Sequence, residues 1–203
     1  HRRQRMIGIW HKIATVQAHL NVIFSDFGTR RRFSQEWHEY IVSVLLRHVS
    51  STQFIGTSNV WLAKKYGLRP IGTMAHRLFM AMSGIVSQDD ASIRNSHQRV
   101  LDEWWDEYGH DLSIALLDTY GSFGLKNFTA EQAHNWKGIR IDSGDPFVEG
   151  DAVIAMYESF GIDPRTKILD PSDGLAIETM IHLADYFTDR IKVNFGWGTN
   201  LTN

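Results

Sequence analysis

The segment Gly56–Gly84, GTSNVWLAKKYGLRPIGTMAHRLFMAMSG, contains two Gly-Thr pairs, each followed by a sequence typical of a helix. The first helix is predicted over Ser58–Tyr66, where Ser58 or Asn59 would act as the N-cap. Leu68–Ile71 is then predicted as a short apolar strand that leads into the second Gly-Thr pair. The segment therefore predicts two successive junctions at which a strand ends and a helix begins.

The second junction places His76 in the first turn of a helix. The first turn of a helix attracts phosphate, because its amide hydrogens are unpaired and the helix dipole favours an anion. A histidine beside such a position can bind a phosphate, and it can also accept a phosphoryl group as a nucleophile.

Composition excludes several classes of protein. The 203 residues carry a formal net charge of −2, which gives no electrostatic support for non-specific binding to nucleic acid. The chain has 43% hydrophobic residues but no apolar run of membrane-spanning length and no signal peptide at its start, so we expect a globular domain and no membrane partner. With no cysteine, disulfides, zinc–thiolate sites and a cysteine nucleophile are excluded, which is compatible with the cytoplasm.

Histidine spacing does not predict a metal site of the protein's own. The ten histidines show no HxH or HExxH pattern, and most of them fall within helical patterns. We expect roles in packing or at the surface for His11, His38, His97 and His182.

Seven apolar segments have the character of buried strands, and polar residues follow each of them. They are Asn21–Phe24, Gln53–Ile55, Leu68–Ile71, Leu112–Leu117, Gly138–Ile141, Lys167–Leu169 and Ile191–Phe195. Helical patterns alternate with them, notably at His1–Ala18, Phe33–Val49, Ala91–Tyr108, Phe147–Phe160 and Leu175–Phe187. This alternation predicts an α/β fold with a parallel sheet.

The polar residues at the strand ends favour a (β/α) barrel, because the carboxyl ends of the strands carry the chemistry in that fold. A complete barrel needs about 250 residues, so the chain would hold about seven βα units of an incomplete barrel. A doubly wound open sheet is the alternative.

Asp142-Ser143-Gly144-Asp145 follows the strand predicted at Gly138–Ile141. Two carboxylates around a serine and a glycine can hold ribose hydroxyls or a Mg²⁺-bound diphosphate. The same residue types also form helix caps and turns, so the motif alone does not decide between the two roles. Arg140 lies two residues before Asp142 and thus on the same face of the strand, where it would supply a cation for an anionic substrate.

Two further strand ends carry candidate binding residues. Phe195-Gly196-Trp197-Gly198-Thr199-Asn200 can hold a phosphate with backbone amides, and Ser172-Asp173-Gly174 follows the preceding strand. Phe27-Gly28-Thr29-Arg30 offers an aromatic ring for stacking on a flat heterocycle and a guanidinium for a carboxylate or phosphate. Taken alone, the latter stretch fits a core phenylalanine before a solvated basic run equally well.

Five motifs, in this order and spacing, closely resemble the nicotinate phosphoribosyltransferase family. They are FSDFGTRRRFS, FIGTSNVWLAKKYGLRPIGTMAHRLF, LLDTY, IRIDSGDP and NFGWGTNLTN. The resemblance covers the chain from about Asn21 to Asn203. It implies an irregular (β/α) barrel, with residues 1–203 forming one phosphoribosyltransferase barrel domain. An N-terminal domain and the C-terminal end of such an enzyme would be missing, so we expect a fragment of a longer protein.

The resemblance also implies a reaction. The enzyme would join nicotinate to phosphoribosyl pyrophosphate, giving nicotinate mononucleotide and pyrophosphate in the salvage route to NAD. ATP would be a co-substrate, Mg²⁺ would enter bound to phosphoribosyl pyrophosphate or ATP, and the active protein is compatible with a cytoplasmic homodimer.

Residue roles follow from the resemblance position by position. His76 matches the phosphorylated histidine, and Asp142 and Asp173 would stand near the ribose. The substrate-binding residues would be Phe27, Arg30, Ser58, Arg140, Ser143, Gly198 and Thr199. At the junction of Ser58 and Asn59 the related nicotinamide enzyme carries an acidic residue, which would repel a carboxylate, so its absence favours nicotinate.

Other functions remain open on the residues alone. A nicotinamide or quinolinate phosphoribosyltransferase would share the barrel, although quinolinate needs a more basic pocket and no phosphohistidine. From a different class, the chain would be an inactive barrel kept for binding or assembly.

Overall fold

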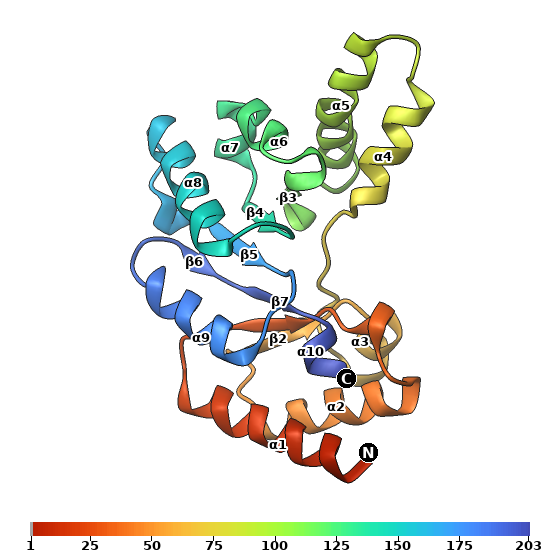
Figure 1. Cartoon of the computed structure of the whole chain (residues 1–203), viewed down its shortest axis with the longest axis vertical. Helices are drawn as coiled ribbons and strands as arrows, with labels where there is room; N and C mark the ends of the chain where they lie inside the picture. The colour runs from red at the N-terminus through yellow and green to blue at the C-terminus, as the bar shows by residue number, and fades with distance from the viewer. Residues whose placement is uncertain (1) are drawn as a thin grey trace. The chain divides into compact units, whose positions relative to one another are not determined.

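The computed structural model describes residues 2–203, and it describes side chains from residue 3 onward. The residues divide into two compact units, whose helices and strands are labelled in Figure 1. Unit 1 contains the described residues up to Gly72, together with Pro171–Thr188 and Val193–Asn203. Unit 2 contains Thr73–Asp170 and Asp189–Lys192. Each unit is described by itself.

A three-stranded parallel sheet in the order β2-β1-β7 forms the centre of unit 1. β1 (Phe24–Asp26) lies between β2 (Phe54–Thr57) and β7 (Phe195–Trp197). All three residues of β1 are buried, and the Phe24 ring contacts Phe54 and Trp197 at centroid distances of 5.5 and 5.3 Å. Because the strands run in one direction, the residues that follow them meet at one edge of the sheet.

Helices surround this sheet. Figure 1 shows α1 (Arg2–Ala18) and α2 (Gln35–His48) side by side next to the strands. Ile13 of α1 and Leu45 of α2 are almost fully buried and contribute to the core. The other helices of unit 1 are η1 (Thr29–Arg31), α3 (Val60–Tyr66), α9 (Ile177–Tyr186) and α10 (Thr199–Thr202).

Unit 2 contains the second sheet, in the order β3-β4-β5-β6, except for Pro171 and Val193 at the ends of the last two strands. β3 (Ile114–Leu116) and β4 (Gly138–Ile141) pair in parallel, and β5 (Ile168–Pro171) and β6 (Lys192–Val193) follow. The α-helices of this unit are α4 (His76–Ile85), α5 (Asp90–Tyr108), α6 (Phe123–Asn127), α7 (Ala130–Asn135) and α8 (Pro146–Ser159). Short 3-10 helices occur at η2 (Gly109–Leu112), η3 (Asp118–Tyr120) and η4 (Pro164–Thr166).

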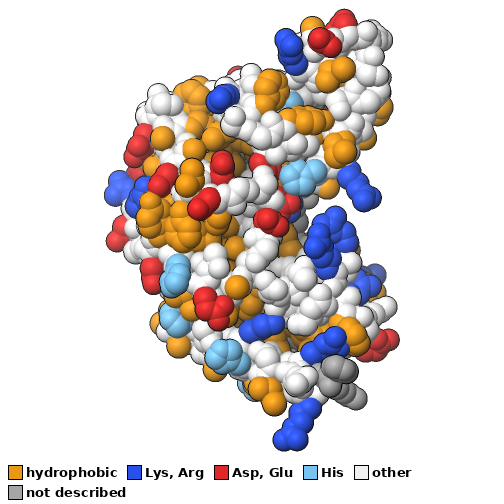
Figure 2. Space-filling model, in the orientation of Figure 1, with side chains coloured by type: hydrophobic (Ala, Val, Ile, Leu, Met, Phe, Trp, Pro, Cys, Tyr) orange, Lys and Arg blue, Asp and Glu red, His pale blue; other side chains and the backbone are white. Residues whose placement is uncertain are grey.

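α4 and α5 form a helical hairpin in unit 2 (Figure 1). Phe79 and Val100 are buried within it, whereas Met80, Ile85 and Ile93 are exposed by 58%, 75% and 42%. Figure 2 shows hydrophobic side chains on the surface of this hairpin. The hairpin thus has an apolar interior and some exposed apolar side chains on its outer surface.

The predicted α/β class with parallel strands is confirmed, and most predicted elements begin or end within a few residues of the observed ones. Asn59, one of the two residues expected to cap the first helix of the Gly56–Gly84 segment, caps α3 by accepting from Leu62 N. Gly67 follows α3 in the left-handed conformation at φ 63°, which glycine adopts without steric cost. The predicted helix at the start of the chain is α1, although His1 itself lies outside the described residues. The barrel stays a prediction.

The strand predicted at Leu68–Ile71 is wrong. Pro70 forms only an isolated bridge with Thr57, although Ile71 N donates to Thr57 O at 2.9 Å. Thr57 N also donates to Arg69 O, so the bridge uses the residues on both sides of Pro70, and Pro70, which has no amide hydrogen, cannot donate to a strand on its other side. The second Gly-Thr pair, Gly72-Thr73, therefore does not follow a strand, and the two pairs do not lie at equivalent junctions.

The single strand predicted over Ile191–Phe195 is also wrong. The segment forms two short strands, β6 and β7, which belong to different sheets and are separated by Asn194. Lys192 N donates to Lys167 O, whereas Phe195 N donates to Ile23 O. The sequence of residues 191–195 does not reveal such a change of partner, because side-chain polarity does not specify which strand a segment pairs with.

His97 of α5 provides a test of packing in unit 2. Its side chain is buried, its ring stacks on Phe79 at a centroid distance of 4.9 Å, and neither ring nitrogen has a hydrogen-bond partner among residues 2–203. Burial lowers the pKa of His97, because the charged imidazolium would lose its hydration. The prediction that His97 serves in packing is consistent with this environment.

We expect His97 to make the fold sensitive to acid. Above about pH 6.5 the imidazole is neutral in both the folded and the unfolded chain and has no effect on the pH dependence. Below that pH the unfolded chain binds a proton that the folded chain does not, so stability falls as the pH falls, by at most about 1.4 kcal/mol per pH unit. In the full-length protein, His97→Leu should lose less thermal stability than wild type between pH 7 and pH 5.5. Equal losses would contradict this account.

Among residues 2–203, no helix combines the length and the apolar character that crossing a membrane requires.

Candidate active site

His76 is the first residue of α4 in unit 2, and both of its ring nitrogens have partners. Nε2 lies 2.9 Å from Asp142 Oδ2, and Nδ1 lies 3.0 Å from Thr119 Oγ1. The imidazole side chain remains 35% exposed, so a substrate in solution can reach it. A carboxylate accepts hydrogen bonds only, so the contact with Asp142 requires the proton on Nε2. In the neutral ring, Nδ1 then carries the lone pair and accepts from the Thr119 hydroxyl.

Asp142 connects His76 to Arg140. The carboxylate contacts His76 through Oδ2 and Arg140 Nη2 through Oδ1, the latter at 2.8 Å. Arg140 lies on β4, and its Nη1 also donates to Thr73 Oγ1 at 2.9 Å. Arg140 and Asp142 thus contact each other, as expected for residues on one face, and their binding of a substrate stays a prediction. Both side chains are largely buried, which strengthens their interaction relative to a surface pair.

Asp118, at the end of the β3 segment, organises the loop that follows β4. Its Oδ2 accepts from Asp142 N and from Ser143 Oγ, both at 2.8 Å. Its Oδ1 is buried, has no hydrogen-bond partner in the described chain and lies 3.9 Å from His76 Nδ1. Asp118, Arg140 and Ser143 also line a cavity of about 70 Å³. The structure therefore places a second carboxylate beside His76.

The motif LLDTY contains Asp118 and Thr119, but the sequence predicted no separate role for either residue. The signal was available, because Asp118 follows a strand at the same edge of the sheet as Asp142. Asp145, by contrast, accepts from Phe147 N and caps α8. Of the two interpretations of the second carboxylate in this motif, the helix cap is therefore observed.

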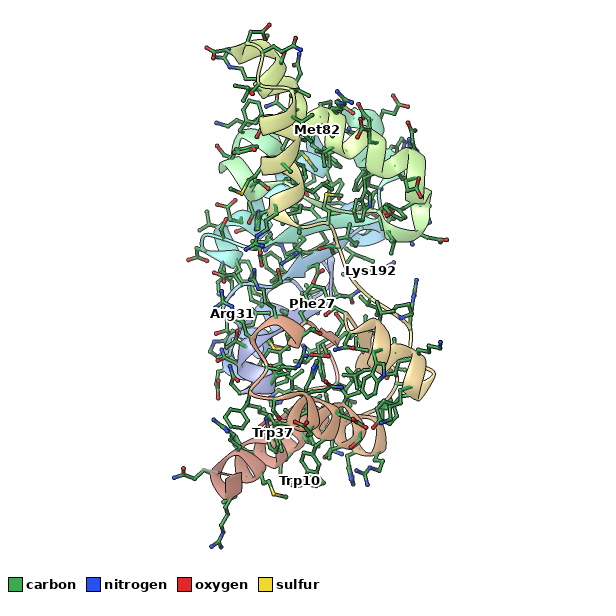
Figure 3. The ribbon with its side chains drawn as sticks, turned by 90° about the vertical axis from the view of Figure 1, so that its right-hand side faces the viewer. Trp10, Phe27, Arg31, Trp37, Met82 and Lys192 are labelled. Carbon is green, nitrogen blue, oxygen red and sulfur yellow. The ribbon has the colours of Figure 1, made fainter. Side chains whose placement is uncertain are left out.

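Phe27 follows β1 in unit 1 and lies next to β7 (Figure 3). Its amide donates to Trp197 O at 2.9 Å. A Cβ added to Gly196 would come within 2.7 Å of the Phe27 ring and 2.9 Å of Ser172 Cβ. Glycine at this position is thus what allows the ring to lie against the strand. A Cβ added to Gly198 would lie 3.4 Å from Phe27 O, so this glycine is also close to Phe27.

The other predicted residues of unit 1 lie on the turns around this strand edge. Asn200 of α10 donates to Gly174 O at 3.2 Å and to Leu175 O at 2.9 Å, which ties the Asp173 turn to the Gly198-Thr199 loop. Asp173 itself is exposed. Ser58 is held through its amide, which donates to Asp26 O at 2.7 Å. Arg30 is exposed on η1 and forms no ion pair with any described residue.

Lys12 is a cation in unit 1 that sequence reasoning missed. Its Nζ donates to Asn200 O, and it lies 5.9 Å from the centre of the Trp197 ring. Burial lowers the pKa of Lys12, and the nearby Glu178 carboxylate opposes that shift. The helical pattern of α1 gave no sign that one of its polar positions would face the loop after β7.

Parallel strands followed by acidic turns in unit 2 and by a glycine-rich turn in unit 1 define an α/β protein with polar residues at its strand ends. A family model described as the nicotinate phosphoribosyltransferase (NAPRTase) family matches residues 22–203. The chain belongs to this family.

The chain is similar to proteins named nicotinate phosphoribosyltransferase. One from Neisseria meningitidis serogroup C is 47% identical over 182 residues, which cover 89% of this chain and 44% of the relative. Among solved structures, a nicotinate phosphoribosyltransferase from Porphyromonas gingivalis has a TM-score of 0.88 and 33% identity, covering 96% of this chain and 49% of the other. One from Vibrio cholerae has a TM-score of 0.87 and 35% identity, covering 99% and 47%. The chain spans about half the length of these relatives.

Proposed function

We propose that the full-length protein carrying this chain joins nicotinate to phosphoribosyl pyrophosphate, with ATP hydrolysis coupled through a phosphohistidine at His76. The single observation that carries the proposal is the partly exposed imidazole of His76, which is held at Nε2 by Asp142 and at Nδ1 by Thr119. Family membership supports the choice of substrates. The substrates are small molecules. The proposed enzyme is cytoplasmic, and a homodimer is compatible with its activity.

In the transfer step, the pyridine nitrogen of nicotinate attacks C1 of the ribose. The bond from C1 to the pyrophosphate oxygen breaks, and its electron pair leaves with pyrophosphate. No protein nucleophile is needed, because positioning and electrostatics lower the barrier. Asp142 and Asp173 would stand near the ribose, with Ser143, Gly198 and Thr199 binding its hydroxyls and phosphate. Phe27 would stack on the pyridine ring, and Arg30, Arg140 and Ser58 would favour the carboxylate of nicotinate over an amide.

In the coupled step, His76 attacks the γ-phosphorus of ATP, ADP departs, and water later hydrolyses the phosphohistidine. The hydrogen bond from Nε2–H to Asp142 leaves the lone pair on Nδ1, so Nδ1 is the nitrogen that accepts the phosphoryl group. Asp142 stabilises the positive charge that develops on the ring during attack. Phosphorylation of His76 would tighten the site, and its hydrolysis would drive product release.

The residues around His76 also fit the Mg²⁺ that would enter with ATP or phosphoribosyl pyrophosphate. Mg²⁺ prefers oxygen ligands, and Asp118 Oδ1 is a carboxylate oxygen without a hydrogen-bond partner among the described residues. Once bound, Mg²⁺ neutralises the charge of a diphosphate leaving group.

Formation of nicotinate mononucleotide by the full-length protein tests the proposal. Nicotinate and phosphoribosyl pyrophosphate are supplied with and without ATP, and nicotinamide and quinolinate replace nicotinate in parallel reactions. Product from nicotinate that rises with ATP would support both the substrate and the role of His76. Product only from nicotinamide or quinolinate would contradict the choice of substrate, and product without any effect of ATP would contradict the phosphohistidine.

A further inference from the structure

Asp26, the last residue of β1, is a carboxylate with no exposed surface. Its Oδ1 accepts from Gly28 N at 2.8 Å. Its Oδ2 accepts from His38 Nε2 and from Thr57 Oγ1, each at 2.6 Å. Three donors from three separate elements, the turn after β1, α2 and β2, therefore converge on one buried carboxylate.

Burying a carboxylate costs free energy unless hydrogen bonds replace its lost hydration. His38 provides one of these hydrogen bonds. The ring of His38 is 1% exposed, and its Nδ1 has no partner among residues 2–203. In the part of the chain that the structure describes, the imidazole therefore hydrogen-bonds to Asp26 alone. An apolar side chain would fill the same position on α2 without an unpaired nitrogen, so packing alone does not account for histidine here.

The same network fixes the ends of two neighbouring strands. Thr57 Oγ1 donates to Asp26 and accepts from Asn59 N at 3.0 Å, which starts α3. Asp26 O accepts from Ser58 N at 2.7 Å. The chain after β1 and the chain after β2 are thus held by both the carboxylate and the carbonyl of Asp26.

Two proposed substrate-binding residues, Phe27 and Ser58, are neighbours in sequence of the residues that form this network. Phe27 lies between Asp26 and Gly28. The Asp26 carboxylate accepts from the Gly28 amide, and Trp197 O accepts from the Phe27 amide. Ser58 lies between Thr57 and Asn59, which are hydrogen-bonded to each other. The backbone on both sides of each residue is therefore fixed, which fixes the direction in which each side chain leaves the strand edge.

We propose that Asp26, with His38 and Thr57 as its donors, is a positioning residue that sets Phe27 and Ser58 for the pyridine ring of nicotinate. This role rests on the proposed function, because it concerns binding of that substrate. Asp26 has no exposed surface, so it acts through these two residues. Loss of a donor should therefore weaken nicotinate binding more than it slows turnover at saturating nicotinate.

Thr57 offers the sharpest substitution, because valine has its shape without its hydroxyl and serine keeps the hydroxyl. In the full-length protein we expect Thr57→Val to raise the KM for nicotinate about tenfold, the effect of one lost hydrogen bond to a charged group. The KM for phosphoribosyl pyrophosphate and kcat should stay within about twofold of wild type. Thr57→Ser should restore the KM for nicotinate, since its hydroxyl can donate to Asp26 again.

Val42→Ala is the matched control for stability. Val42 is fully buried on α2, the helix that carries His38, so its truncation destabilises the same core without removing a hydrogen bond. If Val42→Ala raised the KM for nicotinate as much as Thr57→Val, or if Thr57→Ser failed to restore it, the positioning role would be overturned. A uniform loss of kcat in Thr57→Val would overturn it as well.

Amide hydrogen exchange separates this proposal from the proposed function, because it needs no substrate. In Thr57→Val, exchange should accelerate in peptides covering residues 26–33, which contain the Gly28 amide, and Thr57→Ser should match wild type. Unchanged exchange in Thr57→Val would overturn the network's control of the Phe27 turn. Failure of the wild-type protein to use nicotinate would instead refute the proposed function, and the exchange result would still decide whether Asp26 fixes the turn.

Discussion

Replacing His76 with alanine should abolish the stimulation of nicotinate mononucleotide formation by ATP and leave a weak ATP-independent reaction. The transfer step needs no protein nucleophile, so its basal rate survives the loss of the imidazole. The coupled step loses its phosphoryl acceptor, the imidazole that Asp142 contacts at Nε2 and Thr119 contacts at Nδ1. The ratio of rates with and without ATP should therefore fall to unity.

Two measurements check this outcome in the full-length protein. Product formation is followed with and without ATP, and transfer of the γ-phosphate of ATP to the protein is followed as an acid-labile label. His134→Ala serves as the control, because His134 is an exposed histidine of the same unit, at the end of α7. ATP stimulation that persisted in His76→Ala, or labelling equal to wild type, would show that another group carries the phosphoryl transfer.

Local pattern was enough to predict the parts of the site that depend on neighbouring residues. Arg140 and Asp142 are two residues apart on a strand end, so a period of two places them on one face, and their side chains do pair. His76 was expected in the first turn of a helix and is the first residue of α4. The strand predicted before this helix, Leu68–Ile71, is wrong, because the structure has only an isolated bridge at Pro70.

Contacts that join distant residues could not be predicted in this way. Asp26, His38 and Thr57 meet because β1, α2 and β2 pack together, and helical periodicity alone only indicated that His38 would pack or lie at the surface. Lys12 likewise reaches Asn200 across nearly the whole chain length. Asp118 lies between these cases, since strand order would have placed it near Asp142 once β3 and β4 were known to be neighbours.

Asp142→Asn should cause the largest loss of activity among the substitutions that keep side-chain size. The carboxylate contacts His76 Nε2 at 2.9 Å and Arg140 Nη2 at 2.8 Å, and an amide cannot accept from both. If the amide nitrogen faces the imidazole, His76 loses the acceptor that holds the proton on Nε2, and Nδ1 is no longer the fixed nucleophile. If it faces the guanidinium, Arg140 keeps a largely buried charge beside a donor.

In either orientation the site loses a negative charge close to the ribose, where positive charge is proposed to develop in the transition state. We therefore expect kcat/KM with ATP to fall by about 10² to 10⁴ in the full-length protein, through kcat in the main. Asp163→Asn makes the same change of charge at an exposed cap of η4 in the same unit, where asparagine caps as well as aspartate, so it should retain wild-type activity. Because the expected loss comes from charge and geometry together, Asp142→Glu should recover only part of it: the charge returns, but a longer side chain cannot keep both distances. Full activity in Asp142→Asn would refute the role of this carboxylate in orienting His76 and in stabilising the ribose.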